Sequence, residues 1–197
     1  GRCVYETDIK EVEDALRDAR PEFYKYPYPV KVYWHWTAGH RDMTFNDYHF
    51  CIDGSGNIIH TLPLNFIPTA TYRRNTGSIA IALCAAYGAE AFKGDPYYCK
   101  LGDEPPTDEQ IEALAFLSAK IAQVFDIDID IEHFMTHAEA ADNMDGYDAH
   151  EPYGPNSTCE RWDLAVLLED DEWMSGGDTL RGKAIFYRAQ MDMLDEE

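Results

Sequence analysis

A run of seven residues, 78–84, most constrains how this chain can fold. Its sequence is Ser-Ile-Ala-Ile-Ala-Leu-Cys, so nearly every side chain in it is apolar. Strands without a polar face are typical of the interior of parallel or mixed sheets, because other elements cover both of their faces. The run therefore predicts a central strand.

Other segments have strand patterns as well. Residues 30–36 alternate, with valine and tryptophan side chains on one face and Tyr33 and His35 on the other. Residues 48–52 and 58–62 flank the turn sequence Asp-Gly-Ser-Gly-Asn, which predicts a hairpin.

The sequence predicts four helices, at 7–19, 107–125, 160–168 and 179–194. The second has the clearest start, because Thr107-Asp108-Glu109-Gln110 fits a capping box. A short strand at 133–137 should follow it, and then a polar loop at 140–158. Strands interleaved with helices predict the α/β class: a single domain with a central mixed β-sheet flanked by helices.

Length and charge limit the possible functions. The 197 residues fit one domain with appendages better than two separate cores. Lys and Arg number 16 against 37 Asp and Glu, which gives a formal net charge of −21. This balance argues against nucleic acid or an anionic membrane surface as a partner, since both attract basic proteins. No apolar stretch reaches the ~18 residues that a membrane span needs.

Three residues that can bind metal stand at the ends of predicted elements. His35 and His137 each end a strand, and Cys159 closes the polar loop. Two imidazoles and a thiolate would form a tetrahedral zinc site with one position left for water, the pattern of catalytic zinc. Taken singly, a histidine at a strand end is usually a hydrogen-bonded or surface residue, and a lone cysteine is usually a small core residue.

Five segments that occur in order favour the metal interpretation. They are VYWHWTAG (32–39), DYHF (47–50), RNTGSIAI (74–81), THAE (136–139) and CERWDL (159–164). Together they resemble the zinc-dependent N-acetylmuramoyl-L-alanine amidases of the type-2 family, which share a fold with peptidoglycan recognition proteins. The resemblance implies an N-terminal helical segment (1–29) packed on the domain, an amidase catalytic domain (30–168) and a C-terminal acidic helical extension (169–197).

The resemblance also implies one Zn²⁺ per chain, with His35, His137 and Cys159 as its ligands. The third ligand is Asp in many members of the family and Cys in others. Cys159 stands four residues before Asp163, as in the members that use Cys.

Three departures from the family pattern affect the site. The loop between the second and third ligands is longer than in compact members, so Asp148 or His150 within it are alternative ligands. Ser157 stands where some members have a lysine that supports catalysis. Ala70 stands where many members have a histidine.

Two residues are candidates for assisting catalysis. The resemblance implies that Tyr48 lies beside the metal, where its hydroxyl can donate to a developing oxyanion; packing against apolar neighbours is the alternative. Glu139, two residues after His137, is a candidate for accepting a proton from water or for orienting a ligand. Capping a helix N-terminus is the alternative for Glu139. His49 would point to the opposite face from Tyr48, as a structural residue.

Substrate contacts are expected from Thr37, Arg74 and Asn75, which lie in the shared segments. The pair Arg73-Arg74 could bind the peptide carboxylates of the substrate through forked hydrogen bonds, or have a surface role. The predicted function is hydrolysis of the amide between N-acetylmuramic acid and L-alanine in bacterial peptidoglycan, at the bacterial cell wall. The alternatives are a peptidoglycan-binding domain of the same fold that does not cut, and a structural domain of a wall or phage particle.

Overall fold

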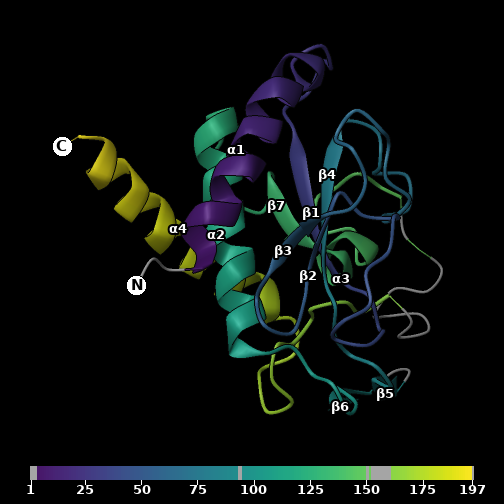
Figure 1. Cartoon of the computed structure of the whole chain (residues 1–197). Helices are drawn as coiled ribbons and strands as arrows, with labels where there is room; N and C mark the ends of the chain where they lie inside the picture. Colours follow the sequence, from purple (N-terminus) through teal and green to yellow (C-terminus); the bar gives the residue numbers. More distant parts are fainter. Residues whose placement is uncertain (1–3, 93–94, 150, 152–160, 197) are drawn as a thin grey trace.

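Figure 1 shows the computed structural model of the chain, which describes residues 4–92, 95–149, 151 and 161–196. Its centre is a five-stranded sheet in the order β3-β2-β4-β1-β7. The strands are β1 (Lys31–Trp36), β2 (Phe50–Ile52), β3 (Ile58–His60), β4 (Ser78–Leu83) and β7 (Phe134–Thr136). β4 lies in the middle, as the apolar run predicts, and pairs in parallel with β1 and β2. β7 is parallel to β1 and β3 antiparallel to β2, which confirms a mixed sheet.

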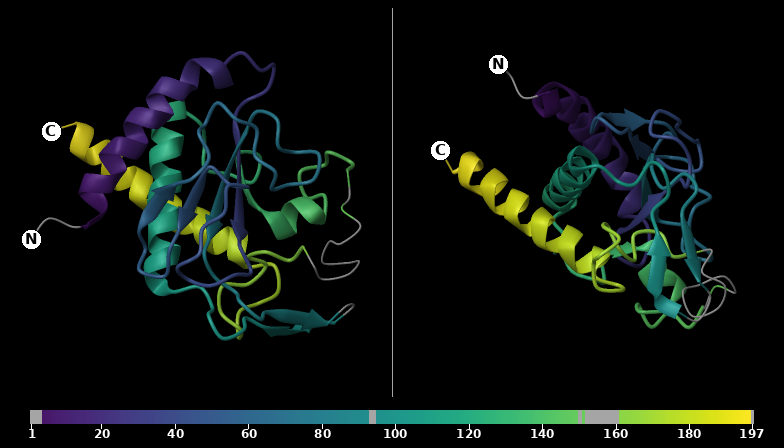
Figure 2. Two further views of the ribbon diagram at one scale, coloured as in Figure 1. Left: turned by 45° about the vertical axis from the view of Figure 1, so that its right-hand side comes forward. Right: turned by 90° about the horizontal axis from the view of Figure 1, so that it is seen from below.

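Helices cover both faces of this sheet. They are α1 (Val4–Phe23), α2 (Asp108–Phe125), α3 (His137–Ala141) and α4 (Gly176–Asp195). α1, α2 and α4 lie on one side, and the short α3 lies on the other (Figures 1 and 2). None of the helices in the described part of the chain is long and apolar enough to cross a membrane.

The alternation of β1 assigns its side chains to the two layers. Trp34 is fully buried on the α2 side, where its indole N–H donates to the hydroxyl of Ser118 over 2.9 Å. Tyr33 points the other way and packs with Met135 and Ala140 beneath α3. The predicted two-faced strand is therefore confirmed, and His35 shares the α3 face with Tyr33 because successive side chains alternate.

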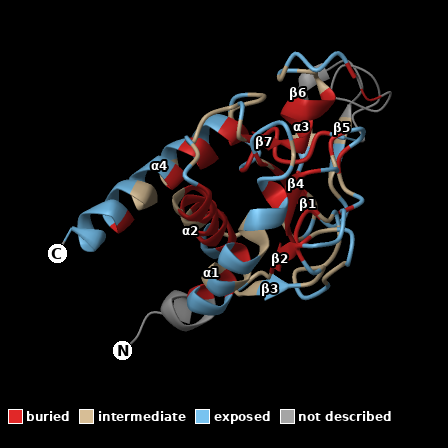
Figure 3. Ribbon diagram, turned by 90° about the horizontal axis from the view of Figure 1, so that it is seen from above, coloured by how far each residue is buried: buried red, intermediate tan, exposed pale blue. Residues whose placement is uncertain are grey.

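α2 is the central helix of the larger layer. It lies between α1, α4 and the sheet, and Figure 3 shows it buried along most of its length. The predicted capping box is present, with Thr107 and Gln110 bonded to each other in both directions. The Gln110 amide also donates to the carbonyls of Ile52 and Cys84, which ties the start of α2 to the ends of β2 and β4.

The structure differs from the sequence-based expectation in two places. The helix expected at 160–168 is wrong: residues 161–168 form turns, and Leu164 has a φ of +60°, which an α-helix cannot contain. The apolar side chains of this segment are buried as expected, but they reach the core from irregular backbone. A hairpin of β5 (Glu90–Phe92) and β6 (Asp95–Lys100) was not predicted.

α4, expected as an extension, belongs to the core of the fold. It packs along α2, and Leu180 is fully buried in the main apolar cluster. Its first turn contacts two segments near the candidate site: the turns at 161–168 and the short helix α3. A Cβ on Gly176 would lie 1.9 Å from the carbonyl oxygen of Leu164, and a Cβ on Gly177 would lie 2.2 Å from Oε1 of Glu139. Only glycine permits such close approach.

A buried ion pair completes this contact. Both terminal nitrogens of Arg181 donate to the carboxylate of Glu139, over 2.9 and 2.7 Å, and one also donates to the carbonyl of Phe134. Arg181 is 7% exposed and Glu139 2%. Either charge left alone in this environment would be strongly destabilising.

We therefore expect Arg181→Ala to lower the free energy of unfolding by about 3–5 kcal/mol, because it leaves the Glu139 carboxylate buried without its partner. Urea unfolding followed by circular dichroism measures the change. Arg188→Ala on the same helix is the matched control, because Arg188 pairs with the half-exposed Asp192 and should cost about 0.5 kcal/mol or less. Equal losses in the two variants would contradict this account.

Candidate metal centre

His35 and His137 meet at one edge of the sheet. β1 and β7 are parallel neighbours, with Trp34 opposite Thr136, so the residues that follow these two come side by side. The Nδ1 atoms of the two histidines lie 3.1 Å apart. Parallel pairing thus brings together two imidazoles that are a hundred residues apart in the sequence.

Asp163 supplies a carboxylate to the same place. Its Oδ2 lies 3.3 Å from Nδ1 of His137 and 3.5 Å from Nδ1 of His35. The backbone fixes this position, since the carbonyl of Asp163 accepts a hydrogen bond from the N–H of Ala138 in α3. All three side chains are buried.

The three atoms match the spacing of zinc ligands. Two ligands about 2.0–2.1 Å from a tetrahedral zinc ion lie about 3.3 Å from each other, and the observed separations are 3.1, 3.3 and 3.5 Å. Within the part of the chain that the structure describes, His35, His137 and Asp163 form the only group of three or more such side chains. Two imidazoles and one carboxylate fit a zinc ion that keeps one position open.

The far nitrogens of both rings are also engaged. Nε2 of His35 lies 3.1 Å from the hydroxyl of Thr71, and Nε2 of His137 lies 2.7 Å from Oε2 of Glu151. Partners of this kind fix the orientation of a metal-binding imidazole. Neither Thr71 nor Glu151 was predicted from the sequence, because nothing in their local sequence marks them as partners of a histidine.

Burial and charge act differently on the three groups. Burial lowers the pKa of His35 to about 4, despite its hydrogen bond to Asp163. Burial also acts to lower the pKa of His137, but the charges and hydrogen bonds of Asp163 and Glu151 raise it to about 9. Burial acts to raise the pKa of Asp163, yet the two histidines hold it well below its usual range. Asp163 is therefore ionised at neutral pH, as a cation requires.

Tyr48 lies beside this centre. Its ring centroid is 5.3 Å from that of His35, and the residue is half-buried. Burial, and then the charge of Asp163, raise the pKa of the Tyr48 phenol. The hydroxyl consequently keeps its proton at neutral pH and can donate a hydrogen bond.

Glu139 has the structural role that was its alternative interpretation. Its Oε1 accepts from the N–H and the hydroxyl of Thr136, over 2.9 and 3.1 Å, and its N–H donates back to that hydroxyl. This capping box starts α3 immediately before His137. With Arg181 on both oxygens as well, the carboxylate is fully engaged.

Arg74 is buried in the structure and does not have the surface role that was its alternative interpretation. It is 6% exposed, and all of its N–H groups donate within the protein. They reach both oxygens of Asp145, the side chain of Asn143 and the carbonyls of Tyr72 and Ala149. In this structure Arg74 therefore anchors the loop that follows α3, and its contact with substrate stays a prediction.

The other predicted residues lie in different places. The Thr37 hydroxyl accepts from the N–H of Gly39 at the end of β1. Asn75 accepts from the N–H groups of Ala70 and Thr71, which shapes the loop that carries Thr71. Asp148 is exposed and is not part of the group of candidate metal ligands. The remaining positions, His150, Ser157 and Cys159, lie outside the described residues.

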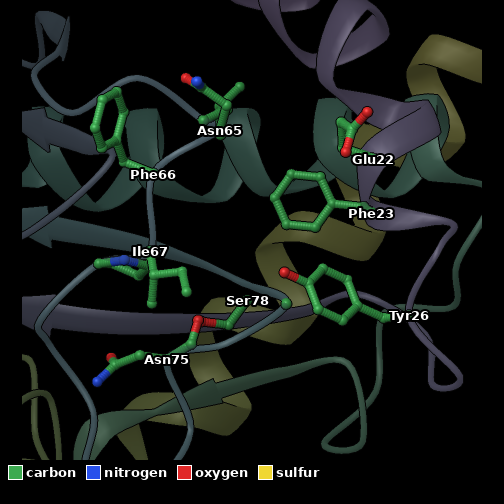
Figure 4. A pocket seen from close by; sticks show the side chains of 11 residues that line it. Glu22, Phe23, Tyr26, Asn65, Phe66, Ile67, Asn75 and Ser78 are labelled. Carbon is green, nitrogen blue, oxygen red and sulfur yellow. The ribbon is translucent and has the colours of Figure 1, made fainter.

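A pocket of about 460 Å³ lies away from this centre, at the end of α1. Phe23 and Tyr26 line it on one side, and Ile67 and Ser78 lie across from them (Figure 4). Of the residues predicted for the functional site, it contains Asn75 alone. The pocket is therefore separate from the two histidines.

Comparison with known proteins identifies the family. The sequence pattern described as N-acetylmuramoyl-L-alanine amidase matches residues 24–152, which is more than half of the chain. The chain belongs to this amidase family. The matched region contains His35, His137 and Glu151, whereas Asp163 and α4 of this amidase-family member lie beyond it.

Three solved structures resemble the amidase-family chain. The Ph2119 endolysin from Thermus scotoductus MAT2119 bacteriophage Ph2119 is 18% identical, with 61% of this chain and 84% of that chain covered and a TM-score of 0.42. The N-acetylmuramoyl-L-alanine amidase LysC from Clostridium intestinale URNW is 20% identical over 67% and 80%, with a TM-score of 0.40. The endolysin amidase LysCS from the same organism has 20% identity over 67% and 79%, also with a TM-score of 0.40. No curated protein matches the chain.

His49, predicted to be structural, generates a test of stability. Its Nδ1 accepts from the N–H of Ala80, and its Nε2 donates to the carbonyl of Phe66 over 2.8 Å, so both nitrogens are used by the neutral ring. Burial lowers the pKa of His49 to about 4, although the Phe66 carbonyl acts to raise it. The unfolded chain therefore takes up a proton below about pH 6.5 that the folded protein excludes until about pH 4.

Stability should consequently fall as the pH drops from 6.5 toward 4. Between pH 7 and pH 5 we expect the wild type to lose about 2 kcal/mol more of its unfolding free energy than His49→Gln, which has no ring to titrate. Urea unfolding at the two pH values measures this difference. The interpretation fails if wild type and variant show the same pH dependence.

Proposed function

We propose that this amidase-family chain hydrolyses the amide bond between N-acetylmuramic acid and L-alanine in bacterial peptidoglycan, with one Zn²⁺ held by His35, His137 and Asp163. The observation that carries the proposal is the convergence of two imidazole nitrogens and a carboxylate oxygen within 3.5 Å of one another. It occurs at the carboxyl ends of parallel strands in a chain of the amidase family.

The chemistry divides between the ion and the protein. When bound, zinc acts as a Lewis acid on the scissile carbonyl and lowers the pKa of a water molecule toward ~7. Thr71 and Glu151 hold the two rings so that both Nδ1 atoms face the same point. Tyr48 donates a hydrogen bond to the carbonyl oxygen as negative charge develops on it. Glu139 takes no proton in this proposal, because its oxygens are bound to Thr136 and Arg181.

The third ligand separates two versions of the site. The resemblance in sequence favoured Cys159, which lies outside the described residues, and the described geometry supports Asp163. A carboxylate and a thiolate both suit zinc. The two versions differ in which substitution releases the metal.

We expect the purified wild type to hold about one zinc ion per chain, and His35→Ala and His137→Ala to hold none. Asp163→Asn should lose zinc, whereas Cys159→Ser should retain it. Inductively coupled plasma mass spectrometry after dialysis measures the zinc content. In the cobalt-substituted protein, no thiolate-to-metal charge-transfer band should be seen. Retention of zinc by Asp163→Asn together with its loss from Cys159→Ser would restore the thiolate as the third ligand.

The role of Tyr48 is tested by removing only its hydroxyl. Tyr48→Phe should lower kcat on peptidoglycan fragments about 100-fold, because it removes a donor to the developing oxyanion, and should leave zinc content unchanged. Release of peptides with a free L-alanine amino group measures the rate. Tyr24→Phe, at an exposed position immediately after α1, is the control and should retain full activity. An unchanged kcat in Tyr48→Phe would show that the ring only packs against His35.

The wild type itself distinguishes an enzyme from a binding domain. A zinc-loaded protein that binds peptidoglycan but releases no peptide from it would favour the binding domain. Release of peptides that stops on removal of zinc with a chelator and returns on its addition would support the hydrolase.

A further inference from the structure

The outer side of α4 is apolar although it faces away from the rest of the protein. One side of this helix packs along α2 and includes the fully buried Leu180 and Ala184. On the opposite side Phe186 and Met193 are 59% and 68% exposed. Figure 3 shows α4 at the margin of the molecule, with this outer side uncovered. A helix that is apolar on two sides has a second surface available for packing.

Four exposed residues form a line along this outer side. Gly182, Phe186, Ala189 and Met193 follow one another at spacings of four, three and four residues. This is the spacing of the a and d positions of a coiled coil, whose side chains all face a partner helix. We call these four residues the α4 seam, which extends about 17 Å along the helix axis. The pattern fits another helix as the occupant of this surface.

Gly182 has no packing role within a single chain. Glycine is unfavourable inside a helix, and Gly176 and Gly177 are tolerated because Leu164 and Glu139 lie too close for any side chain there. Apart from the backbone of its own helix, no described atom lies within 4 Å of a Cβ placed on Gly182. The α4 seam therefore has an open notch into which a large side chain of a partner helix can pack.

Small and large side chains alternate along the α4 seam, in the order glycine, phenylalanine, alanine and methionine. When two copies of α4 lie antiparallel, Phe186 of one can face Ala189 of the other. The same register sets Gly182 opposite Met193, because Gly182 precedes Phe186 by four residues and Met193 follows Ala189 by four. Each large side chain then meets a small one, as close packing requires. Parallel helices would set each residue against its own copy, with Phe186 against Phe186.

The charges beside the seam are compatible with this pairing. Residues 179–191 contain three basic residues and no acidic one, in a chain whose net charge is −21. Arg188 pairs with Asp192 on the same helix over 3.1 Å, and Lys183 pairs with Glu112 of α2 over 2.6 Å. The two cations that flank the seam are thus neutralised within their own chain, and a second copy does not have to supply carboxylates for them.

We propose that two copies of this chain associate through their α4 seams, with the two helices antiparallel and related by a two-fold axis. Such an interface is isologous, because both copies contribute the same residues. The inference is independent of the proposed function, since α4 lies beyond the region that matches the amidase family. Interfaces below about 1,200 Å² are weak and reversible, and for two seams of this length we expect a dissociation constant on the order of 10–100 μM.

Sedimentation velocity of the full chain measures this association. Over a range of about 5–500 μM the wild type should pass reversibly from monomer to dimer. Raising the salt concentration from about 0.05 M to 0.5 M should tighten the dimer several-fold. The reason is that salt screens the repulsion between two chains that each carry a net charge of −21.

Exchanging the large and small residues at the centre of the seam tests the register. Phe186→Ala leaves a cavity and Ala189→Phe sets two phenylalanines against each other, so each should weaken dimerisation about 10-fold or more. The double variant again places a large side chain opposite a small one. Its dissociation constant should return to within about 3-fold of the wild-type value, because the two sites contact each other across the interface.

Gly182→Leu fills the notch and separates a lost interface from lost folding. It should weaken dimerisation about 10-fold or more, while raising the thermal midpoint of the monomer because leucine is the better helix former. Phe66→Ala is the matched control for Phe186→Ala, since Phe66 is 56% exposed and lines the pocket of Figure 4. This control should leave the dissociation constant unchanged.

Three other results would overturn the inference. The first is a wild type that stays monomeric at every concentration. The second is a dimer that Phe186→Ala and Gly182→Leu leave unchanged, or that the double variant fails to recover. The third is cosedimentation of a monomeric wild type with phosphatidylglycerol vesicles that is lost in Phe186→Ala, which would assign the α4 seam to a lipid surface.

Discussion

Parallel pairing of β1 with β7 is the constraint on which the functional face depends. It sets Trp34 opposite Thr136, so His35 and His137 leave the sheet at the same edge with their Nδ1 atoms 3.1 Å apart. Antiparallel pairing would send the ends of the two strands in opposite directions. The crossover that parallel strands require is supplied by α2, whose buried contacts with Trp34 hold β1 against the larger layer.

The positions of Asp163 and of the short helix α3 depend on contacts with α4. Its first turn lies against Leu164, the neighbour of Asp163, and against Glu139, which caps the helix that begins with His137. Arg181 then joins Glu139 to the end of β7. The region that matches the amidase family ends at residue 152, so in this chain a helix outside the match supports two segments that carry candidate ligands.

The pKa values of the buried histidines depend on whether charged or neutral groups contact the ring nitrogens. Glu151 and Asp163 contact His137, whereas His49 contacts only backbone groups, and the pKa values of the two rings move in opposite directions. The same principle distinguishes the arginines. The guanidinium of Arg74 is bound to the Asp145 carboxylate, whereas the exposed Arg73 lines a cavity and forms no such pair with a described residue. The internal partners of a side chain therefore decide which of its donors and acceptors remain available to solvent or to a ligand.

Local sequence patterns were enough to predict the apolar strand β4, the alternation of β1, the capping box of α2, and the positions of His35 and His137 at strand ends. Such signals arise from the conformational preferences of a few adjacent residues. Tertiary contacts were needed to bring Asp163 beside the two histidines and to pair Glu139 with Arg181. They were also needed to engage the N–H groups of Arg74 in internal hydrogen bonds and to hold residues 161–168 in an irregular conformation. Each of these outcomes depends on contacts between residues far apart in the chain. Residue spacing and local conformational propensity do not predict such contacts, because they depend on how the whole chain folds.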